Sequence, residues 1–335
     1  MHDKILLAHG NGGRYSHKLV KELFQRYLGN EYLDQMNDAA VFSVPGDKLA
    51  FTTDSFVVSP LVFPGGDIGK LAVCGTVNDL AVSGARPLYL SAGFIIEEGF
   101  PMEKLEKIVA SMANTAREAG VQIITGDTKV VPRGHVDGLF INTSGIGVLL
   151  PGVDVAGSHA RAGDLVVING TIGDHGMAIM AARSELGIIA DLKSDSAPLN
   201  NLIIELLEVV PEVRVLRDPT RGGVATTLNE IARQSEVGIA LEEYALPVND
   251  SVKSTCDMLG LDPLYLANEG KFLAVIPRND IGKALSVFKK HPQGREAAVL
   301  GEIVETPPGK VYLKTTIGGK RMVDMLVADQ LPRIC

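Results

Sequence analysis

The segment IGKLAVCGTVNDLAVSGARPLYLSAGFII, residues 68–96, decides the fold of the first half of the chain. Its first part, 68–84, is rich in small apolar residues and ends at a glycine, which is typical of a helix packed closely against a sheet. Its second part, 87–96, has the composition of a β-strand. A helix followed by a strand of this kind indicates a layer of helices on a sheet.

The neighbouring segments extend the same pattern. Strands are predicted at 49–58, 121–131 and 138–150, and an amphipathic helix at 102–120. The turn-rich segment 151–164 shows no periodicity, so we place a domain boundary after residue 150. Beyond it we predict helices near 173–187, 197–210, 221–236 and 279–291, strands near 164–170, 270–277 and 297–305, and a hairpin that turns at Gly318–Gly319.

These elements predict an α+β fold. We expect two mixed domains, residues 1–150 and 151–327, each with helices covering one face of its sheet, followed by a flexible tail, 328–335.

The composition excludes several classes of protein. With 40 acidic residues against 32 Lys and Arg, the net charge of −8 argues against a broad nucleic-acid surface. The three cysteines, Cys74, Cys256 and Cys335, are far apart and form no CxxC pair, so we expect neither a structural disulfide nor a zinc site. No apolar run is long enough for a signal peptide or a membrane span, and we expect a cytoplasmic protein without a membrane partner.

Five aspartates share one kind of setting, in which small or hydroxyl residues flank the acid beside an apolar element. They are Asp38, Asp54, Asp79, Asp127 and Asp218. A carboxylate there is costly to bury unless it is paired or binds a metal, and several of them together would suit Mg²⁺. Each could instead cap a helix or close a turn.

Three glycine clusters, HGNGG (9–13), GDHG (173–176) and TRGGV (220–224), could direct backbone N–H groups at an anion. None is a Walker loop or a dinucleotide fingerprint, and a lone glycine cluster is most often only a turn. Together with the acids they favour a nucleotide triphosphate bound without a P-loop.

Two further residues are candidate acids or bases. Lys129 lies two positions after Asp127 on the same predicted strand, and Glu269 precedes another strand. A dry cleft could move the pKa of either group toward neutrality. The simpler interpretations are a salt bridge from Lys129 to Asp127 and a turn at Glu269.

The chain ends in LPRIC, residues 331–335, so its third cysteine is the terminal residue. Pro332 disfavours helix, and eight extended residues span about 26 Å. The tail could therefore carry the Cys335 thiol into a cleft of the protein or out to a partner.

The motifs LAHGNGG, NDAAVF, FTTDSF, TVNDLAVSG, TGDTKVV, GDHG, RDPTRGGV, LANEGKF and terminal PRIC stand in the order found in the HypE family of hydrogenase maturation factors. The chain resembles this family of carbamoyl dehydratases from about residue 5 to residue 335. The family belongs to the PurM-like ATP-binding superfamily, with the aminoimidazole ribonucleotide (AIR) synthetases, and terminal PRIC distinguishes it from the other members.

The resemblance implies a function for the tail. A carbamoyltransferase, HypF, would place a carbamoyl group on Cys335, and ATP-dependent dehydration would turn the S-carboxamide into an S-cyanate. A HypC–HypD complex would then receive the cyano group for the iron of a [NiFe] hydrogenase. The resemblance also implies a homodimer in which two N-terminal domains pair, with ATP near their interface.

The resemblance assigns roles to residues of this chain. Those implied as Mg²⁺ ligands are Asp38, Asp54, Asp79 and Asp218. Those implied to line the nucleotide or substrate site are Gly12, Gly13, Asp127, Thr128 and Asn142. Lys129 and Glu269 would act as catalytic bases, beside the reactive Cys335.

Two other functions remain open at this level. One is a superfamily kinase or synthetase that acts on a free small molecule, although such an enzyme has no need of a reactive terminus. The other is a nucleotide-sensing scaffold for metal-centre assembly, in which Cys335 binds a metal or a partner.

Overall fold

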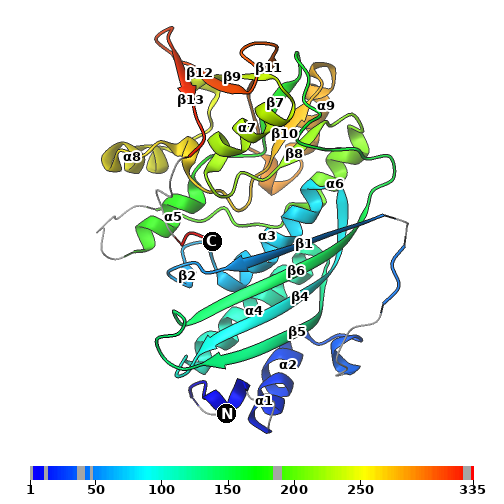
Figure 1. The fold of residues 1–335 in the computed structure, drawn as a ribbon, viewed down its shortest axis with the longest axis vertical. Helices are drawn as coiled ribbons and strands as arrows, with labels where there is room; N and C mark the ends of the chain where they lie inside the picture. The colour runs from blue at the N-terminus through cyan, green and yellow to red at the C-terminus, as the bar shows by residue number, and fades with distance from the viewer. Residues whose placement is uncertain (1–2, 11–13, 36–41, 46–47, 184–190, 327–332) are drawn as a thin grey trace.

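The computed structural model describes residues 3–10, 14–35, 42–45, 48–183, 191–326 and 333–335. Two sheets, each with its own helices, lie one above the other in Figure 1 and form the two halves of the molecule. The predicted α+β class is confirmed. None of the helices in the described ranges is long and apolar enough to cross a membrane.

The first sheet has four strands in the order β1-β6-β4-β5. These are β1 (Leu49–Phe56), β4 (Ala85–Glu97), β5 (Gln122–Val131) and β6 (Leu139–Leu149). Only the β4–β5 pair among them is parallel. Short strands β2 (Val62–Phe63) and β3 (Gly66–Asp67) pair separately beside it.

Helices α3 (Ile68–Val82) and α4 (Met102–Ala119) cover one face of this sheet. The small residues predicted to allow close packing do so. A Cβ atom at Gly75 would lie 2.9 Å from Phe56 Cζ of β1, and one at Gly69 would lie 2.4 Å from the backbone oxygen of Ile108 on α4. Near the N-terminus, α1 (Arg14–Leu19), a π-helical turn (Val20–Phe24) and α2 (Gln25–Leu28) pack at the β5 edge.

The second sheet has seven strands in the order β13-β12-β9-β11-β7-β10-β8. They are β7 (Leu165–Ile168), β8 (Val215–Arg217), β9 (Gly238–Glu242), β10 (Leu273–Ile276), β11 (Ala298–Val304), β12 (Lys310–Lys314) and β13 (Lys320–Val323). Its helices are α5 (Asp174–Ala182), α6 (Asn200–Val209), α7 (Gly223–Gln234), α8 (Asp250–Leu259) and α9 (Ile281–Phe288).

Both faces of the second sheet are covered, which corrects one detail of the prediction. Alternate residues of β10 belong to different cores: Leu273 and Val275 pack with α7, whereas Ala274 and Ile276 pack with α6 and α9. The strand is apolar on both sides and therefore buried on both sides. Among the described residues, the first sheet is the one that has helices on a single face, as predicted for both.

The two sheets use separate parts of the chain, 49–149 and 165–323, and we retain residues 150/151 as the proposed domain boundary. The halves nonetheless share a core, because Ala81 and Val82 of α3 pack with Leu202 and Leu206 of α6. The candidate site lies where these two halves meet.

Candidate active site

Three of the predicted aspartates lie together between the two sheets. Asp54 is on β1 and faces α3, which carries Asp79, and Asp218 follows the end of β8. Thr52, two residues before Asp54, donates a hydrogen bond of 2.8 Å from Oγ1 to Asp79 Oδ2. The period of two along β1 therefore presents both side chains to the same helix.

Burial and mutual repulsion change the acidity of this group. Burial, followed by the charge of Asp79, raises the pKa of Asp54 to about 6. The same two causes raise the pKa of Asp218 to about 7. Such raised values show that this cluster lacks enough positive charge for three ionised carboxylates.

The C-terminal residues lie in the same region (Figure 1). The Val57 N–H donates to the Cys335 carbonyl at 3.2 Å, and the Ser59 N–H donates to the Arg333 carbonyl at 3.1 Å. These bonds hold residues 333–335 alongside the segment after β1. Cys335 thereby lines a cavity of about 170 Å³ together with Ser55, Arg221 and Tyr265.

The Cys335 thiol is protonated in this environment. Burial raises its pKa to about 12, and the nearby charges of Glu269 and Asp54 add to the effect. The Arg221 guanidinium acts in the opposite direction, through its charge and a hydrogen bond to the thiol. Arg221 lines the same cavity as Cys335, and Glu269 and Asp54 lie near enough for their charges to act on the thiol.

Two hydrogen bonds hold the backbone of Glu269 in place. Its N–H donates to Asp195 Oδ1 at 3.1 Å, and its carbonyl accepts from Asn78 Nδ2 at 3.2 Å. The side chain is 3% exposed, and its Oε1 has no hydrogen-bond partner in the described part of the chain. Burial first, and then the charges of Asp195, Asp218 and Asp54, raise the Glu269 pKa well above its ordinary value.

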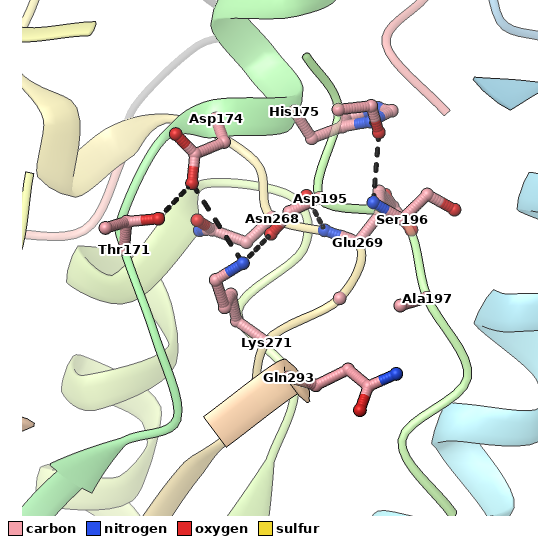
Figure 2. A network of polar contacts seen from close by, with 12 residues as sticks. Thr171, Asp174, His175, Asp195, Ser196, Ala197, Asn268, Glu269, Lys271 and Gln293 are labelled. Carbon is pink, nitrogen blue, oxygen red and sulfur yellow. Dashed lines mark hydrogen bonds and ion pairs between the residues drawn. The ribbon is translucent and has the colours of Figure 1, made fainter. Parts of the chain in front are cut away.

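Figure 2 shows the polar network that fixes the Glu269 loop. Lys271 Nζ lies 3.0 Å from Asp195 Oδ2 and 4.0 Å from Asp174 Oδ2. Asp174 also accepts hydrogen bonds from Thr171 and Asn249. Burial acts to raise the pKa of Asp195, but the charge of Lys271 and the hydrogen bonds from the Glu269 N–H and the Lys271 ammonium outweigh it, so the pKa is lowered and the carboxylate stays ionised.

The other predicted residues lie elsewhere on the first sheet. Asn142 donates from Nδ2 to the Asp54 carbonyl at 2.8 Å, on the face away from α3. Asp127 and Lys129 lie on β5, three strands from β1, and their side chains approach to 3.9 Å while both stay exposed. With Thr128 they line a second cavity, of about 260 Å³, whose walls include Phe24 and Phe94.

The structure thus brings together Asp54, Asp79, Asp218, Glu269 and Cys335, but in one chain it does not bring Lys129 to them. Asp38, Gly12 and Gly13 lie outside the described residues. Within the described ranges, no group of three or more His, Cys, Asp or Glu side chains has the geometry to hold a metal ion. The assignment of four aspartates to Mg²⁺ stays a prediction.

Some backbone amides of two of the glycine clusters are hydrogen-bonded within the chain, and anion binding by these clusters stays a prediction. In GDHG, the Gly173 N–H donates to Asn268 Oδ1 at 2.8 Å and the Gly176 N–H donates to the Ala267 carbonyl at 3.0 Å. Both amides are therefore engaged within the chain. In TRGGV, the Gly223 N–H likewise donates to the Thr220 carbonyl at 3.0 Å.

The sequence analysis missed Arg221, Asn78 and Asp195 as parts of the site. Arg221 stands inside the quoted TRGGV motif and Asn78 next to Asp79, so their positions offered a signal. Asp195 offered none, because the segment around it has no regular secondary structure and meets Glu269 only through the fold.

Comparisons with known proteins agree with this architecture. The model of the AIR synthase related protein N-terminal domain matches residues 36–149, and that of the C-terminal domain matches residues 161–314. A thiamine-monophosphate kinase from Stenotrophomonas maltophilia K279a has a similar fold, with a TM-score of 0.67 at 19% identity over 88% of this chain and 95% of that one.

Other relatives have much higher sequence identity to this chain. Carbamoyl dehydratase HypE of Azotobacter vinelandii is 55% identical over 99% of this chain and 97% of its own length, and that of Escherichia coli K12 is 48% identical over 99% and 100%. A crystal structure of the hydrogenase maturation protein HypE in complex with ATP has a TM-score of 0.95 at 51% identity, covering 98% of this chain and 99% of that one. A HypE–HypF complex structure has a TM-score of 0.81 at 54% identity, covering 92% and 99%.

With half of its residues identical over nearly the whole length, and with the terminal cysteine in a cavity beside Arg221 and near a buried glutamate, the chain belongs to the HypE family of carbamoyl dehydratases, which are hydrogenase maturation enzymes.

Proposed function

We propose that the protein dehydrates a carboxamide on its own C-terminal cysteine, at the expense of ATP, in the cytoplasm. A HypF carbamoyltransferase loads Cys335, and a HypC–HypD complex later takes the cyano group as a ligand for the iron of a [NiFe] hydrogenase. The observation that carries this proposal is that Cys335 lines a cavity with Arg221, near enough to Glu269 and Asp54 for their charges to raise its pKa.

The reaction balances as S-carboxamide plus ATP giving S-cyanate, ADP and phosphate. The carboxamide oxygen attacks the γ-phosphorus, displaces ADP and leaves later within the phosphate, while the two amide protons are removed and the C≡N bond forms. Phosphorylation is needed because an amide oxygen is otherwise a very poor leaving group. The protein has to hold the oxygen in line with the phosphate and exclude water.

The residues around the sulfur suit these tasks. Glu269 is buried, has an oxygen without a hydrogen-bond partner in the described part of the chain, and has a raised pKa, so its carboxylate is a stronger base than an exposed one. Arg221 supplies positive charge and N–H donors beside the sulfur, where charge develops on the departing phosphate.

The aspartates suit Mg²⁺, because Asp54, Asp79 and Asp218 offer only oxygen and repel one another. These three residues, with Asp38, would hold the ion. When bound, Mg²⁺ neutralises charge on the phosphates and on the carboxylates that raise the Glu269 pKa.

The cavity below β5 suits the nucleoside part of ATP. Its walls are apolar, and Asp127, Thr128 and Lys129 supply polar groups. An apolar pocket with a few polar groups is typical of ligand sites.

A homodimer would explain why Lys129 and Cys335 are separate in one chain. Across three strand spacings, β5 lies about 14 Å from β1. The face of the sheet away from α3 and α4 exposes Leu49, Phe51 and Ile95, and Phe51 is 70% exposed. Pairing of two such faces would cover this apolar surface and bring the partner's Lys129 closer to Cys335.

Two experiments test the proposal. Intact mass spectrometry of the HypF-treated protein, before and after Mg²⁺–ATP, should show carbamoyl addition and then the loss of one water mass, both on the C-terminal peptide and both absent in Cys335→Ser. Carbamoylation without water loss would overturn the dehydratase assignment. Light scattering should give twice the chain mass for the wild type and less for Phe51→Glu, and a monomeric wild type would refute the dimer.

A further inference from the structure

His175, in the GDHG motif, contacts the end of the chain. It is the second residue of α5 and its side chain is 0% exposed. Its Nε2 lies 2.8 Å from the carbonyl oxygen of Ile334, the residue before Cys335. Its Nδ1 lies 2.8 Å from Ser194 Oγ, and its ring packs edge-on against Phe63 at 5.6 Å between centroids.

These contacts determine which nitrogen carries the proton. A carbonyl oxygen only accepts, so His175 Nε2 must donate to Ile334. In the neutral ring Nδ1 then accepts, and its donor is the Ser194 hydroxyl, whose oxygen in turn accepts from the Ser196 N–H at 3.1 Å. Burial lowers the His175 pKa, which agrees with a neutral ring.

The same short segment holds Glu269. Ser194 fixes His175, and the next residue, Asp195, accepts the Glu269 N–H. The Ser194 N–H donates to the Pro64 carbonyl at 2.8 Å, which ties the segment to the first domain. One hydrogen-bonded stretch, residues 194–196, therefore links His175, which contacts Ile334, to the candidate base; Figure 2 shows the part around His175, Asp195 and Glu269.

Several other anchors of the tail come from the first domain. They are the backbone bonds from Val57 and Ser59 and the ion pair between Arg333 and Asp137, at 2.6 Å. His175 belongs instead to the second domain, which carries Glu269 and Arg221. It contacts the residue next to the reactive cysteine, so it controls where the sulfur lies relative to those groups.

We infer that His175 is a positioning residue that donates its Nε2 proton to the Ile334 carbonyl and thereby places Cys335 against Glu269. This inference deepens the proposed function and rests on it for the catalytic consequence. The contact itself can be tested without any turnover.

The test is the rate of alkylation of Cys335 by iodoacetamide, followed by intact mass and peptide mapping. Cys74 and Cys256 are 0% and 1% exposed, so they report unfolding within the same molecule. His175→Phe keeps an aromatic ring but removes both nitrogen atoms. Losing the hydrogen bond from His175 to the Ile334 carbonyl should speed alkylation of Cys335 by about 2- to 12-fold, while Cys74 and Cys256 stay unmodified.

Two variants serve as controls. His175→Gln keeps an N–H donor at about the position of Nε2 and should restore most of the protection of Cys335. His159→Phe makes the same substitution at a half-buried imidazole that contacts Asp154, and it should alkylate like the wild type. Equal alkylation of His175→Phe and wild type would overturn the inference, as would joint labelling of all three cysteines, which indicates unfolding.

The catalytic consequence is measured on carbamoylated protein. His175→Phe should dehydrate more slowly at saturating ATP with an unchanged KM for ATP, and His175→Gln should recover the rate. Should wild-type protein lose no water, the proposed function fails while the alkylation result still decides the contact. Should wild type and His175→Phe dehydrate equally fast, the positioning role fails alone.

Discussion

Asn78 is the residue whose loss we expect to be most informative. Its side chain makes three hydrogen bonds between α3 and the second domain: Nδ2 donates to the Ala197 and Glu269 carbonyls at 3.1 and 3.2 Å, and Oδ1 accepts the Leu199 N–H at 2.8 Å. Asn78→Ala removes all three and leaves the Glu269 carbonyl and the Leu199 N–H buried without their partner. At about 1–3 kcal/mol for each of these two groups, the free energy of unfolding should fall by about 2–6 kcal/mol.

Asn78→Asp provides a second test, because it keeps the side-chain volume but replaces the NH₂ donor with a second acceptor oxygen. An ionised carboxylate would then face two carbonyl oxygens beside Asp79, so at pH 8 this variant should be less stable than Asn78→Ala. At pH 5 protonation restores an O–H donor, and Asn78→Asp should regain stability relative to Asn78→Ala.

Urea unfolding followed by circular dichroism at pH 5 and pH 8 measures these differences from the shift in midpoint. Asn114→Ala is the matched control: Asn114 is exposed on α4 and its side chain bonds only Arg117 among the described residues, so its loss should change stability by less than about 0.5 kcal/mol. Midpoints of Asn78→Ala equal to that control, or an Asn78→Asp variant more stable than Asn78→Ala at pH 8, would refute the reasoning.

Three further predictions concern the site. Because the pKa of Asp218 is raised to about 7, its contribution to stability is present at low pH and lost as the pH rises toward 7; without divalent cations the unfolding free energy should fall by up to about 3 kcal/mol from pH 5 to pH 8, and Asp218→Asn should reduce this slope. An unchanged slope in urea titrations would contradict it. Gly223→Ala places a Cβ atom 2.5 Å from the Leu266 carbonyl at a φ of 61° and should cost several-fold more stability than Gly260→Ala, where φ is 68° and nothing lies within 4 Å; equal thermal shifts would exclude the steric argument. Glu269→Gln mimics the protonated acid, so at a pH near the ordinary glutamate pKa of 4.5 its stability should match wild type, while dehydration of carbamoylated protein slows; normal turnover would remove Glu269 as the base.

Much of the fold follows from local pattern. The helix predicted at 102–120 forms at Met102–Ala119, and the strand predicted at 138–150 forms at Leu139–Leu149, because their periodicity matches one buried face. Helix α8 and strand β9 were not predicted. The sequence DSVKSTCDML of α8 buries only Val252, Thr255 and Cys256, so its apolar pattern is weak.

The sequence likewise predicted only part of the candidate site. Asp54, Asp79, Asp218, Glu269 and Cys335 were predicted from their local settings and motifs, and the structure brings them together. Lys129 was predicted with them but lies beside the cavity at β5 instead. Its motif carries no information about which of the two cavities its strand would line.

The sequence by itself determined most of the elements, the α+β class and most of the reactive groups, because periodicity, small-residue content and acid settings are local properties. Only the tertiary structure decided that Cys335 is partly buried in a cavity, that His175 contacts the residue before it, and that Asn78 and Asp195 hydrogen-bond the Glu269 backbone. The physical reason is that a buried hydrogen bond is defined by its partner. For these residues the partner is distant in the chain and approaches only when the two sheets pack together.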